Sequence, residues 1–293
     1  MIGSRFVDFF KSRITNLVEL NHPEFDLISE NEGEIFTRFA KFGNDILLLF
    51  AAFTDVDAAE NQRGNKDAVC WQLNVEGTRK LVSVCQKLNL KMVYISTDFV
   101  FAGLDGPNSE VDEVAEFETE ISWYGWSKLA GEKIIAQNLS NFLIARTSYP
   151  YRANFESKTD FIRNIITKFA NNVSYPTFVD QFLTPTFIDN FVKALNLLIK
   201  ENQQGTWHVT DNTTLTPHEI AIKIADIFEF NKDNIEKSSI LEFQSKNPKV
   251  ARRPVKGGLK NDKLRKFLAS FSEDMQDFHQ ALVTMKKQME VAR

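Results

Sequence analysis

A continuous apolar run from Ile46 to Phe53 is the feature that most constrains the fold of this chain. A strand that faces water on one side alternates apolar and polar residues, whereas a strand covered on both faces reads as an unbroken apolar run. The run therefore predicts a strand that is buried on both faces, as in a parallel sheet covered by helices.

Strand-like and helix-like segments alternate along the rest of the chain, which favours the same α/β architecture. Strands are expected within residues 16–20, 45–53, 92–101, 141–147 and 205–210. Helices are expected over residues 4–12, 67–88, 158–170 and 188–200, around Tyr124, after Thr216 and from residue 262 to the end. The pattern loosens after residue 150, so we expect one domain over residues 1–150 and a smaller lobe over 151–293, with segments that return to the sheet.

Composition excludes several classes of protein. Of the 293 residues, 43% are hydrophobic and 25% are charged, as in ordinary globular proteins, and the net charge of −4 offers no basic surface for nucleic acid. The longest apolar run is far shorter than the ~20 residues that cross a bilayer, and the charged residues near the start, such as Arg5 and Lys11, do not fit a signal peptide. Cys70 and Cys85 have no metal-type spacing. We therefore expect a cytoplasmic protein with no metal site and no nucleic-acid or membrane partner.

Tyr124 and Lys128 lie four positions apart, which places them on one face of a helix. An ammonium group beside a phenol lowers the pKa of the phenol, and such a phenol can exchange a proton with a sugar or alcohol oxygen. The preceding strand ends in Ser96, Thr97 and Asp98, at the edge of a parallel sheet where ligands bind. These residues together predict a proton-transfer site.

Several motifs, in order and spacing, resemble the extended short-chain dehydrogenase/reductase superfamily, and within it the dTDP-4-dehydrorhamnose reductase family. They are Ala51-Ala-Phe-Thr-Asp-Val-Asp-Ala-Ala-Glu60, Asn74-Val-Glu-Gly-Thr78, Ser96-Thr-Asp-Phe-Val-Phe101, Tyr124-Gly-Trp-Ser-Lys-Leu-Ala-Gly-Glu132, Asp180-Gln-Phe-Leu-Thr-Pro-Thr186, Gly205-Thr-Trp-His208 and Arg253-Pro254. The resemblance covers nearly the whole chain and implies a Rossmann-like, doubly wound parallel sheet with a small C-terminal substrate-binding lobe.

The resemblance also implies an activity, namely the NAD(P)H-dependent reduction of a 4-keto-6-deoxy nucleotide sugar, dTDP-4-dehydrorhamnose to dTDP-L-rhamnose. Tyr124, Lys128 and Thr97 would be catalytic, and Thr97, Asp98 and Tyr149 would contact the substrate. The cofactor, NADP or NAD, would be bound by Gly3, Asp26, Leu27, Ala51, Ala52, Phe53, Tyr124 and Lys128. Tyr149 stands where the family has Trp, and Leu183 stands where it has Gly. The resemblance leaves a homodimer open.

The beginning of the chain departs from the family. Family members open with a strand and a Gly-x-x-Gly-x-x-Gly turn whose backbone approaches the cofactor pyrophosphate, and here only Gly3, the last of the three glycines, has a counterpart. The first strand and most of the glycine turn are missing. We interpret this either as a start downstream of the true one, which we favour, or as a truncated form.

Alternative interpretations remain. Ser96 and Thr97 could cap the strand end, Asp98 and Asp26 could be turn residues, and Ala51 and Ala52 could serve tight packing. An epimerase or dehydratase of the same superfamily is a second enzyme class, but dehydratases carry Asp-Glu after the threonine and here Asp98 is followed by Phe99. A third hypothesis is a regulatory subunit of the type that accompanies methionine adenosyltransferase.

Overall fold

A parallel sheet of four strands lies at the centre of the larger part of the protein. The computed structural model describes residues 1–14, 16–43 and 45–291. The strand order is β1-β2-β3-β7, with β1 (Ile46–Leu49), β2 (Lys91–Thr97), β3 (Phe142–Thr147) and β7 (Gly205–His208) all parallel. The carboxyl ends of the strands therefore meet at one edge, as the α/β prediction requires.

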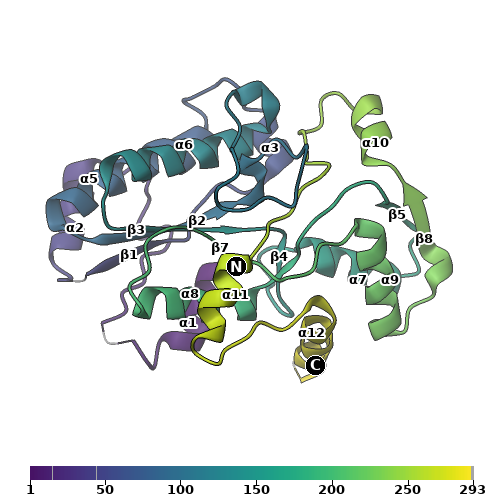
Figure 1. The fold of residues 1–293 in the computed structure, drawn as a ribbon. Coiled ribbons are helices and arrows are strands. Elements are labelled where there is room, and N and C mark those ends of the chain that lie inside the picture. Colours follow the sequence, from purple (N-terminus) through teal and green to yellow (C-terminus); the bar gives the residue numbers. More distant parts are fainter. Residues whose placement is uncertain (15, 44, 292–293) are drawn as a thin grey trace.

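Helices cover both faces of this sheet (Figure 1). Met92 and Tyr94 of β2 face one apolar core, and Val93 between them faces another. The first face is covered by α2 (Glu32–Ala40), α3 (Val56–Glu60), α5 (Thr78–Leu88) and α6 (Trp123–Asn138). The second face is covered by α1 (Ile2–Phe10), α8 (Ile188–Lys200) and α11 (Asp262–Ala269). This confirms the doubly covered, Rossmann-like α/β fold.

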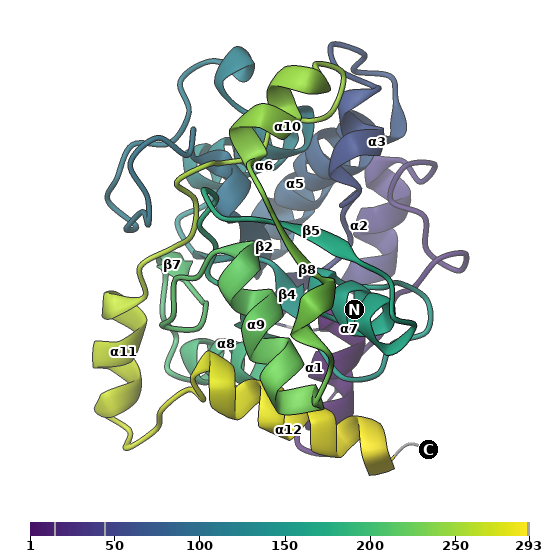
Figure 2. The ribbon, with the colours of Figure 1, turned by 90° about the vertical axis from the view of Figure 1, so that its right-hand side faces the viewer.

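A smaller lobe lies beyond the carboxyl edge of the sheet, on the right of Figure 1 and towards the viewer in Figure 2. It holds two short parallel pairs, β4 (Pro150–Tyr151) with β6 (Thr186–Phe187), and β5 (Tyr175–Phe178) with β8 (Ile235–Ser238). Its helices are α7 (Phe161–Ala170), α9 (Pro217–Phe228), α10 (Ile240–Lys246) and α12 (Phe278–Val291). Because β7 is a strand of the sheet and α8 packs on its face, residues beyond 150 contribute to both parts of the protein.

The strand expected within residues 16–20 does not form, and this prediction was wrong. The segment has no regular structure over residues 17–20. Within the described part of the chain, no strand pairs with the outer edge of β1, so β1 is an edge strand of the sheet. Residues 17–20 therefore lie outside the sheet, and the outer edge of β1 has no strand partner among the described residues.

The bounds of several other expected elements differ in the structure, and the C-terminal region is divided. The helix expected over residues 67–88 consists of α4 (Val69–Trp71), a π-helical stretch η1 (Gln72–Gly77) and α5. The strand expected over residues 92–101 ends at Thr97, where a 3₁₀ turn, η2 (Asp98–Val100), begins. The region from residue 262 forms two helices, because Ser272 takes a positive φ of 56° and Asp277 accepts a hydrogen bond from Gln280 N, which starts α12. Two further 3₁₀ turns are η3 (Glu118–Glu120) and η4 (Lys232–Asn234).

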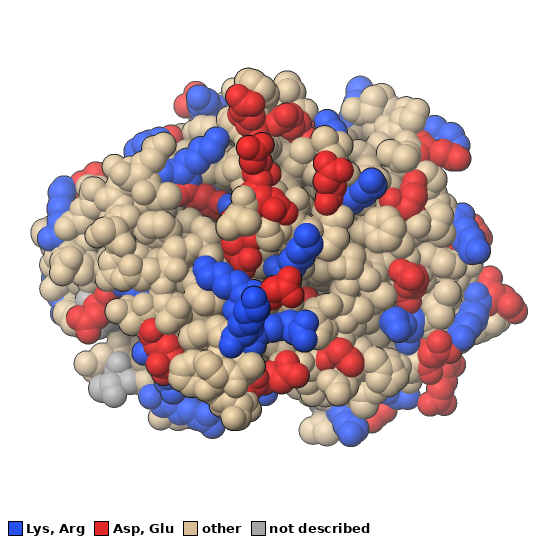
Figure 3. Space-filling model, in the orientation of Figure 1, with Lys and Arg blue, Asp and Glu red and all other residues tan. Residues whose placement is uncertain are grey.

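Charged side chains are interspersed over the face seen in Figure 3, with a small group of Lys and Arg near its centre. In the described residues, no helix has the length and apolar character needed to cross a bilayer.

Candidate functional site

Tyr124 and Lys128 occupy the first turns of α6. Ser122 caps the helix by accepting a hydrogen bond from Gly125 N at 3.1 Å. Both side chains are buried, with exposed fractions of 9% for Tyr124 and 2% for Lys128. The Lys128 ammonium group lies 3.8 Å from the ring centroid of Tyr94 on β2. The helix thus carries the pair into the interior, so the two side chains do not form a solvated helix face.

Two glycines allow α6 to lie this close to β2 and to the turn after it. A Cβ atom on Gly125 would stand 2.2 Å from the carbonyl oxygen of Phe99, and one on Gly131 would stand 2.4 Å from the Tyr94 hydroxyl. Only glycine fits such an approach without displacing the neighbour. The glycines of this motif therefore fix the depth at which Tyr124 and Lys128 sit.

Polar side chains from the ends of β2 and β3 gather beside Tyr124. The Thr97 hydroxyl donates to Asp98 Oδ1 at 3.2 Å, and the Ser148 hydroxyl donates to Asp98 Oδ2 at 2.7 Å. Thr97 and Thr147 are register partners, so both strand ends reach the same edge. Sequence reasoning predicted Thr97 and Asp98 and missed Ser148, although its position directly after a strand end was a usable signal.

Aromatic rings connect this edge to the second lobe. The ring centroids of Phe99 and Tyr124 are 5.9 Å apart, those of Phe99 and Tyr149 are 6.1 Å apart, and those of Tyr149 and Phe161 of α7 are 5.6 Å apart. Tyr149 has a φ of 42°, a strained value for a residue with a side chain, and such strain concentrates at functional sites. The structure therefore brings Tyr149 to the same place as Tyr124, Thr97 and Asp98.

Burial is the main cause of the pKa shifts of Tyr124, Lys128 and Asp98. Burial raises the pKa of Tyr124 above its ordinary value, and a hydrogen bond with Thr97 opposes the rise. Burial lowers the pKa of Lys128 to about 7, with Glu132 acting in the opposite direction. Burial also raises the pKa of Asp98 to about 6, against the hydrogen bonds from Ser148 and Thr97. The expected lowering of the Tyr124 pKa by Lys128 is not found, because burial outweighs other influences on the phenol.

Asn74, in the π-helical stretch, joins three elements of the site. Its amide oxygen accepts a hydrogen bond from Phe53 N at 2.8 Å, and its amide nitrogen donates to Phe53 O at 3.1 Å and to Ser127 Oγ at 2.9 Å. Ser127 in turn donates to Tyr124 O at 2.8 Å. Asn74 thus ties the end of β1 to α6, and π-helical turns of this kind are frequent at functional sites. Sequence reasoning singled out Asn74 and missed Ser127, a serine whose burial no local pattern indicates.

The predicted cofactor-binding residues lie in two groups. Ala51, Ala52 and Phe53 follow β1 at the carboxyl edge of the sheet, and Ala51 is exposed. A Cβ atom on Gly3 would stand 3.1 Å from Phe50, so Gly3 lets α1 pack closely on the end of β1. That close helix–strand packing is the role of the last glycine in dinucleotide-binding turns.

Asp26 and Leu27 form the second group, on the loop before α2. Asp26 accepts a hydrogen bond from Ile28 N at 3.0 Å, and Leu27 is buried against Gly77. The Lys80 ammonium group holds this loop by donating to the carbonyl oxygens of Leu27, Ile28 and Glu30. This group lies beside the start of α5, apart from the Tyr124 group.

The residues around Tyr124 and at the end of β1 fit the binding of a nicotinamide cofactor. The buried Lys128 and Tyr124, the close-packing Gly3 and the small side chains of Ala51 and Ala52 match what such a cofactor requires.

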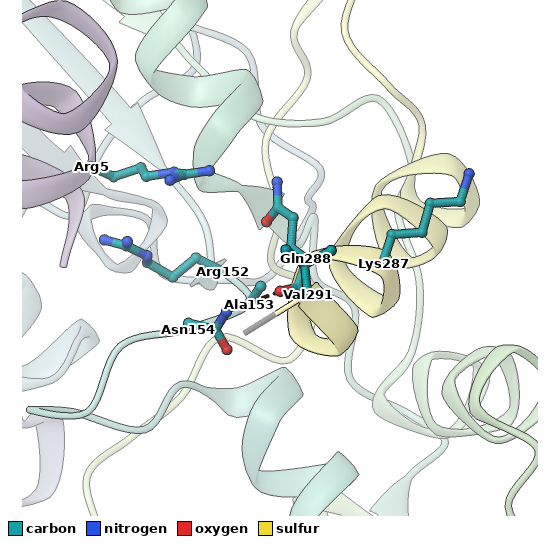
Figure 4. A pocket seen from close by; sticks show the side chains of 7 residues that line it. All are labelled: Arg5, Arg152, Ala153, Asn154, Lys287, Gln288 and Val291. Atoms are coloured by element: carbon teal, nitrogen blue, oxygen red, sulfur yellow. Dashed lines mark hydrogen bonds between the residues drawn. The ribbon is translucent and has the colours of Figure 1, made fainter. Parts of the chain in front are cut away.

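A separate pocket of about 370 Å³ lies between α1, the segment after β4 and α12 (Figure 4). Its two arginines are already paired. Arg5 forms two 2.6 Å hydrogen bonds to Asp189, and Arg152 donates to Met1 O and Ser4 Oγ. None of the predicted catalytic residues lines this pocket, so we place the candidate site at the carboxyl edge of the sheet instead. Among the described residues, no group of three or more His, Cys, Asp and Glu is placed to hold a metal ion.

The fold and the Tyr124–Lys128 arrangement define a protein of the extended short-chain dehydrogenase/reductase class. The chain belongs to the family described as the RmlD substrate binding domain, which matches residues 1–291. The family expected from the motifs is thereby confirmed.

Individual relatives support this assignment. The chain is 29% identical to the probable low-salt glycan biosynthesis reductase Agl14 of Haloferax volcanii over 68% of its own length and 65% of that protein. It is 29% identical to the dTDP-4-dehydrorhamnose reductase of Mycolicibacterium smegmatis over 67% of its own length and 56% of that protein. The matched parts therefore span less than two thirds of these relatives. The crystal structure of dTDP-4-dehydrorhamnose reductase from Bacillus anthracis in complex with NADP superimposes with a TM-score of 0.84 at 23% identity, covering 98% of this chain and 95% of that one, and so shares the fold.

Proposed function

We propose that this protein is an NAD(P)H-dependent reductase of a 4-keto-6-deoxy nucleotide sugar, with dTDP-4-dehydrorhamnose as substrate and dTDP-L-rhamnose as product. The observation that carries the proposal is the convergence of Tyr124, Thr97 and Lys128 at the carboxyl edge of the sheet, in a chain of this family. The family relatives named dTDP-4-dehydrorhamnose reductase support the choice of sugar.

The reaction adds a hydride to C4 of the sugar and a proton to the oxygen on C4. The bound cofactor, NADPH or NADH, supplies the hydride. Tyr124 supplies the proton, which its phenol carries at neutral pH because burial raises the pKa. Thr97, which ends β2 beside Tyr124, contacts the same sugar oxygen.

Lys128 holds the nicotinamide ribose, and its charge favours transfer of the proton from Tyr124 by stabilising the phenolate that remains. Asp98 and Tyr149 contact the sugar from the side of the second lobe. Gly3, Asp26, Leu27, Ala51, Ala52 and Phe53 complete the cofactor site. In this proposal residues 1–150 bind the cofactor, the lobe within residues 151–293 binds the sugar nucleotide, and the protein acts in the cytoplasm.

The turn after Thr97 argues against dehydratase chemistry. Phe99 stands there, and its ring packs between those of Tyr124 and Tyr149, so no carboxylate follows Asp98 to act as a second acid or base. A reductase consumes one reduced cofactor for each sugar, whereas an epimerase or dehydratase regenerates its cofactor.

The test is to incubate the chain with NADPH and dTDP-4-dehydrorhamnose, and to follow NADPH absorbance together with the mass of the sugar product. We expect equal amounts of NADPH consumed and product formed, and no reaction with Tyr124→Phe. A folded chain that binds NADPH and leaves the sugar unchanged would contradict the proposal. Stimulation of a methionine adenosyltransferase by the same chain would then favour the regulatory class.

A further inference from the structure

A buried ion pair joins α6 to β3 behind the candidate site. Arg146 donates from Nε to Glu132 Oε1 at 2.9 Å and from Nη2 to Glu132 Oε2 at 2.7 Å. The side chains are 7% and 6% exposed, respectively. A buried, bidentate ion pair of this kind fixes both side chains in one geometry. Its residues are not among those to which we assigned contact with the substrate or cofactor.

The position of Glu132 on α6 relates it to the site. Tyr124, Lys128 and Glu132 follow one another at intervals of four residues, so they share one face of the helix. Arg146 is the register partner of Ser96, which directly precedes Thr97. The ion pair therefore connects the helix that carries Tyr124 and Lys128 to the two strands whose ends carry the remaining polar groups of the site.

Few charges act on the Lys128 ammonium group. The titratable groups that face it are Glu132 and Tyr124 on its own helix, Cys70 on α4 and Tyr94 on β2. Burial raises the pKa of the Cys70 thiol and of both phenols, so these groups are uncharged at neutral pH. Asp98, on η2, acts on Tyr124 instead. Glu132 is thus the group whose negative charge opposes the effect of burial on Lys128.

Arg146 holds Glu132 in place. Without the guanidinium group, the carboxylate buried beside β3 would lose both of the hydrogen bonds that it accepts from Arg146. The guanidinium carbon also lies 5.1 Å from the ring centroid of Phe101, which fixes Arg146 from its other side. His208, the register partner of Arg146, is uncharged at neutral pH, because burial lowers its pKa to about 3. It therefore adds no second charge to the pair.

We propose that Glu132, held by Arg146, is a positioning residue that fixes α6 against β3 and keeps Lys128 protonated in the working enzyme. The inference rests on the proposed reductase function, in which a charged Lys128 supports proton transfer from Tyr124. It assigns to the last residue of the Tyr124–Glu132 motif a role that is distinct from contact with either ligand.

The decisive experiment is the pH profile of kcat/KM for the wild type, Glu132→Gln and Glu132→Asp. Removing the negative charge makes Lys128 easier to deprotonate, so we expect the alkaline limb of Glu132→Gln to move to lower pH by about one pH unit. Glu132→Asp retains the charge and is the matched control, with an alkaline limb at the wild-type position. A Glu132→Gln enzyme that is slower at every pH, with its alkaline limb unmoved, would overturn the proposal.

Arg146→Lys provides a second test, which does not depend on whether Glu132→Gln folds. This variant keeps the positive charge and loses the bidentate hydrogen bonding. We therefore expect kcat to fall by about tenfold, with the alkaline limb of the pH profile unchanged. Wild-type kcat and KM in Arg146→Lys would overturn the positioning role.

The same variants are titrated with NADPH across the pH range, by fluorescence and without any sugar. As the pH rises, we expect the affinity for NADPH to begin to fall at a lower pH in Glu132→Gln than in the wild type. A wild-type chain that binds NADPH but does not reduce the sugar would contradict the proposed function alone, and the NADPH titration would still decide the role of Glu132.

Discussion

The two ends of the candidate cofactor site are built in different ways. Around Tyr124 and Lys128, the helix, two strand ends and the π-helical turn are locked together by Gly125, Asn74 and buried hydrogen bonds. Around Asp26 and Leu27, a loop is held by the ammonium group of Lys80, by the Arg38–Glu30 ion pair and by the buried side chain of Leu27. The comparison teaches that this sequence preorganises the reacting end of the site within its core, whereas the other end is a loop tied to the neighbouring helices by a few side chains.

The largest expected effect is on the reacting end. Tyr124→Phe removes the proton donor and keeps the ring that packs against Phe99. We expect kcat for sugar reduction to fall by about 10²- to 10⁴-fold, the usual range for the loss of a general acid, with little change in NADPH affinity. Stopped-flow turnover and fluorescence titration measure the two quantities. Equal kcat in the two proteins would remove Tyr124 from the mechanism.

Gly125→Ala tests whether packing depth is fixed at this end. The added methyl group would stand 2.2 Å from the Phe99 carbonyl oxygen, and backbone cannot give way cheaply, so we expect a loss of about 3 kcal/mol in the free energy of unfolding.

Gly33→Ala in α2 is the matched control. Its methyl group would have only the Asn31 side chain nearby, at 3.3 Å. We expect unchanged stability or a gain of up to about 1 kcal/mol from helix propensity. Urea denaturation compares the two variants, and equal losses in both would refute the difference between the two ends.

Asp98→Asn tests the electrostatics of the reacting end. Because burial raises the pKa of Asp98 to about 6 from 3.8, the folded protein binds the proton more tightly than the unfolded chain. The contribution of Asp98 to stability is therefore fully present below pH 3.8 and is lost as the pH rises through 6. Between pH 4 and pH 7.5, we expect the free energy of unfolding of the variant to rise by about 2–3 kcal/mol relative to that of the wild type. Parallel unfolding curves at the two pH values measure this gain, and a pH-independent difference would show that Asp98 titrates normally.

The smallest expected effect belongs to the other end. Asn31 caps α2 by accepting a hydrogen bond from Glu34 N at 3.1 Å, and Glu34 Oε2 accepts from Asn31 N at 2.8 Å. Asn31→Ala should cost about 1 kcal/mol in the free energy of unfolding and leave kcat unchanged. Thr216→Ala, at the equivalent cap of α9, is the control in the second lobe. A large loss of kcat in Asn31→Ala alone would mean that the two ends are coupled.

The parts of this fold that were predictable from sequence are those governed by local pattern. The apolar run at Ile46 and the capping sequence at Thr216 both correspond to the elements expected. The segment at residues 16–20 was misread, because a short strand-like pattern does not show whether the segment pairs with the sheet, and this one does not. The convergence of Thr97, Asp98 and Tyr124 follows from the rule that parallel strands present their carboxyl ends together.

Other features depend on burial, which sequence does not show. The rise in the Tyr124 pKa and the Ser148–Asp98 hydrogen bond arise from the interior that α6, β2 and β3 enclose. The pairing of Glu132 with Arg146 joins residues whose partnership no spacing rule indicates.

The most direct test of this account is a fluorescence titration of NADPH into the chain and into its Lys128→Ala variant, with circular dichroism to confirm that both are folded. The account predicts saturable binding by the wild type and at least tenfold weaker binding by the variant, because Lys128 is a buried part of the preorganised end of the site. A folded wild-type chain that does not bind NADPH, or a variant that binds it equally well, would contradict the claim that the Tyr124–Lys128 end of the site holds the cofactor.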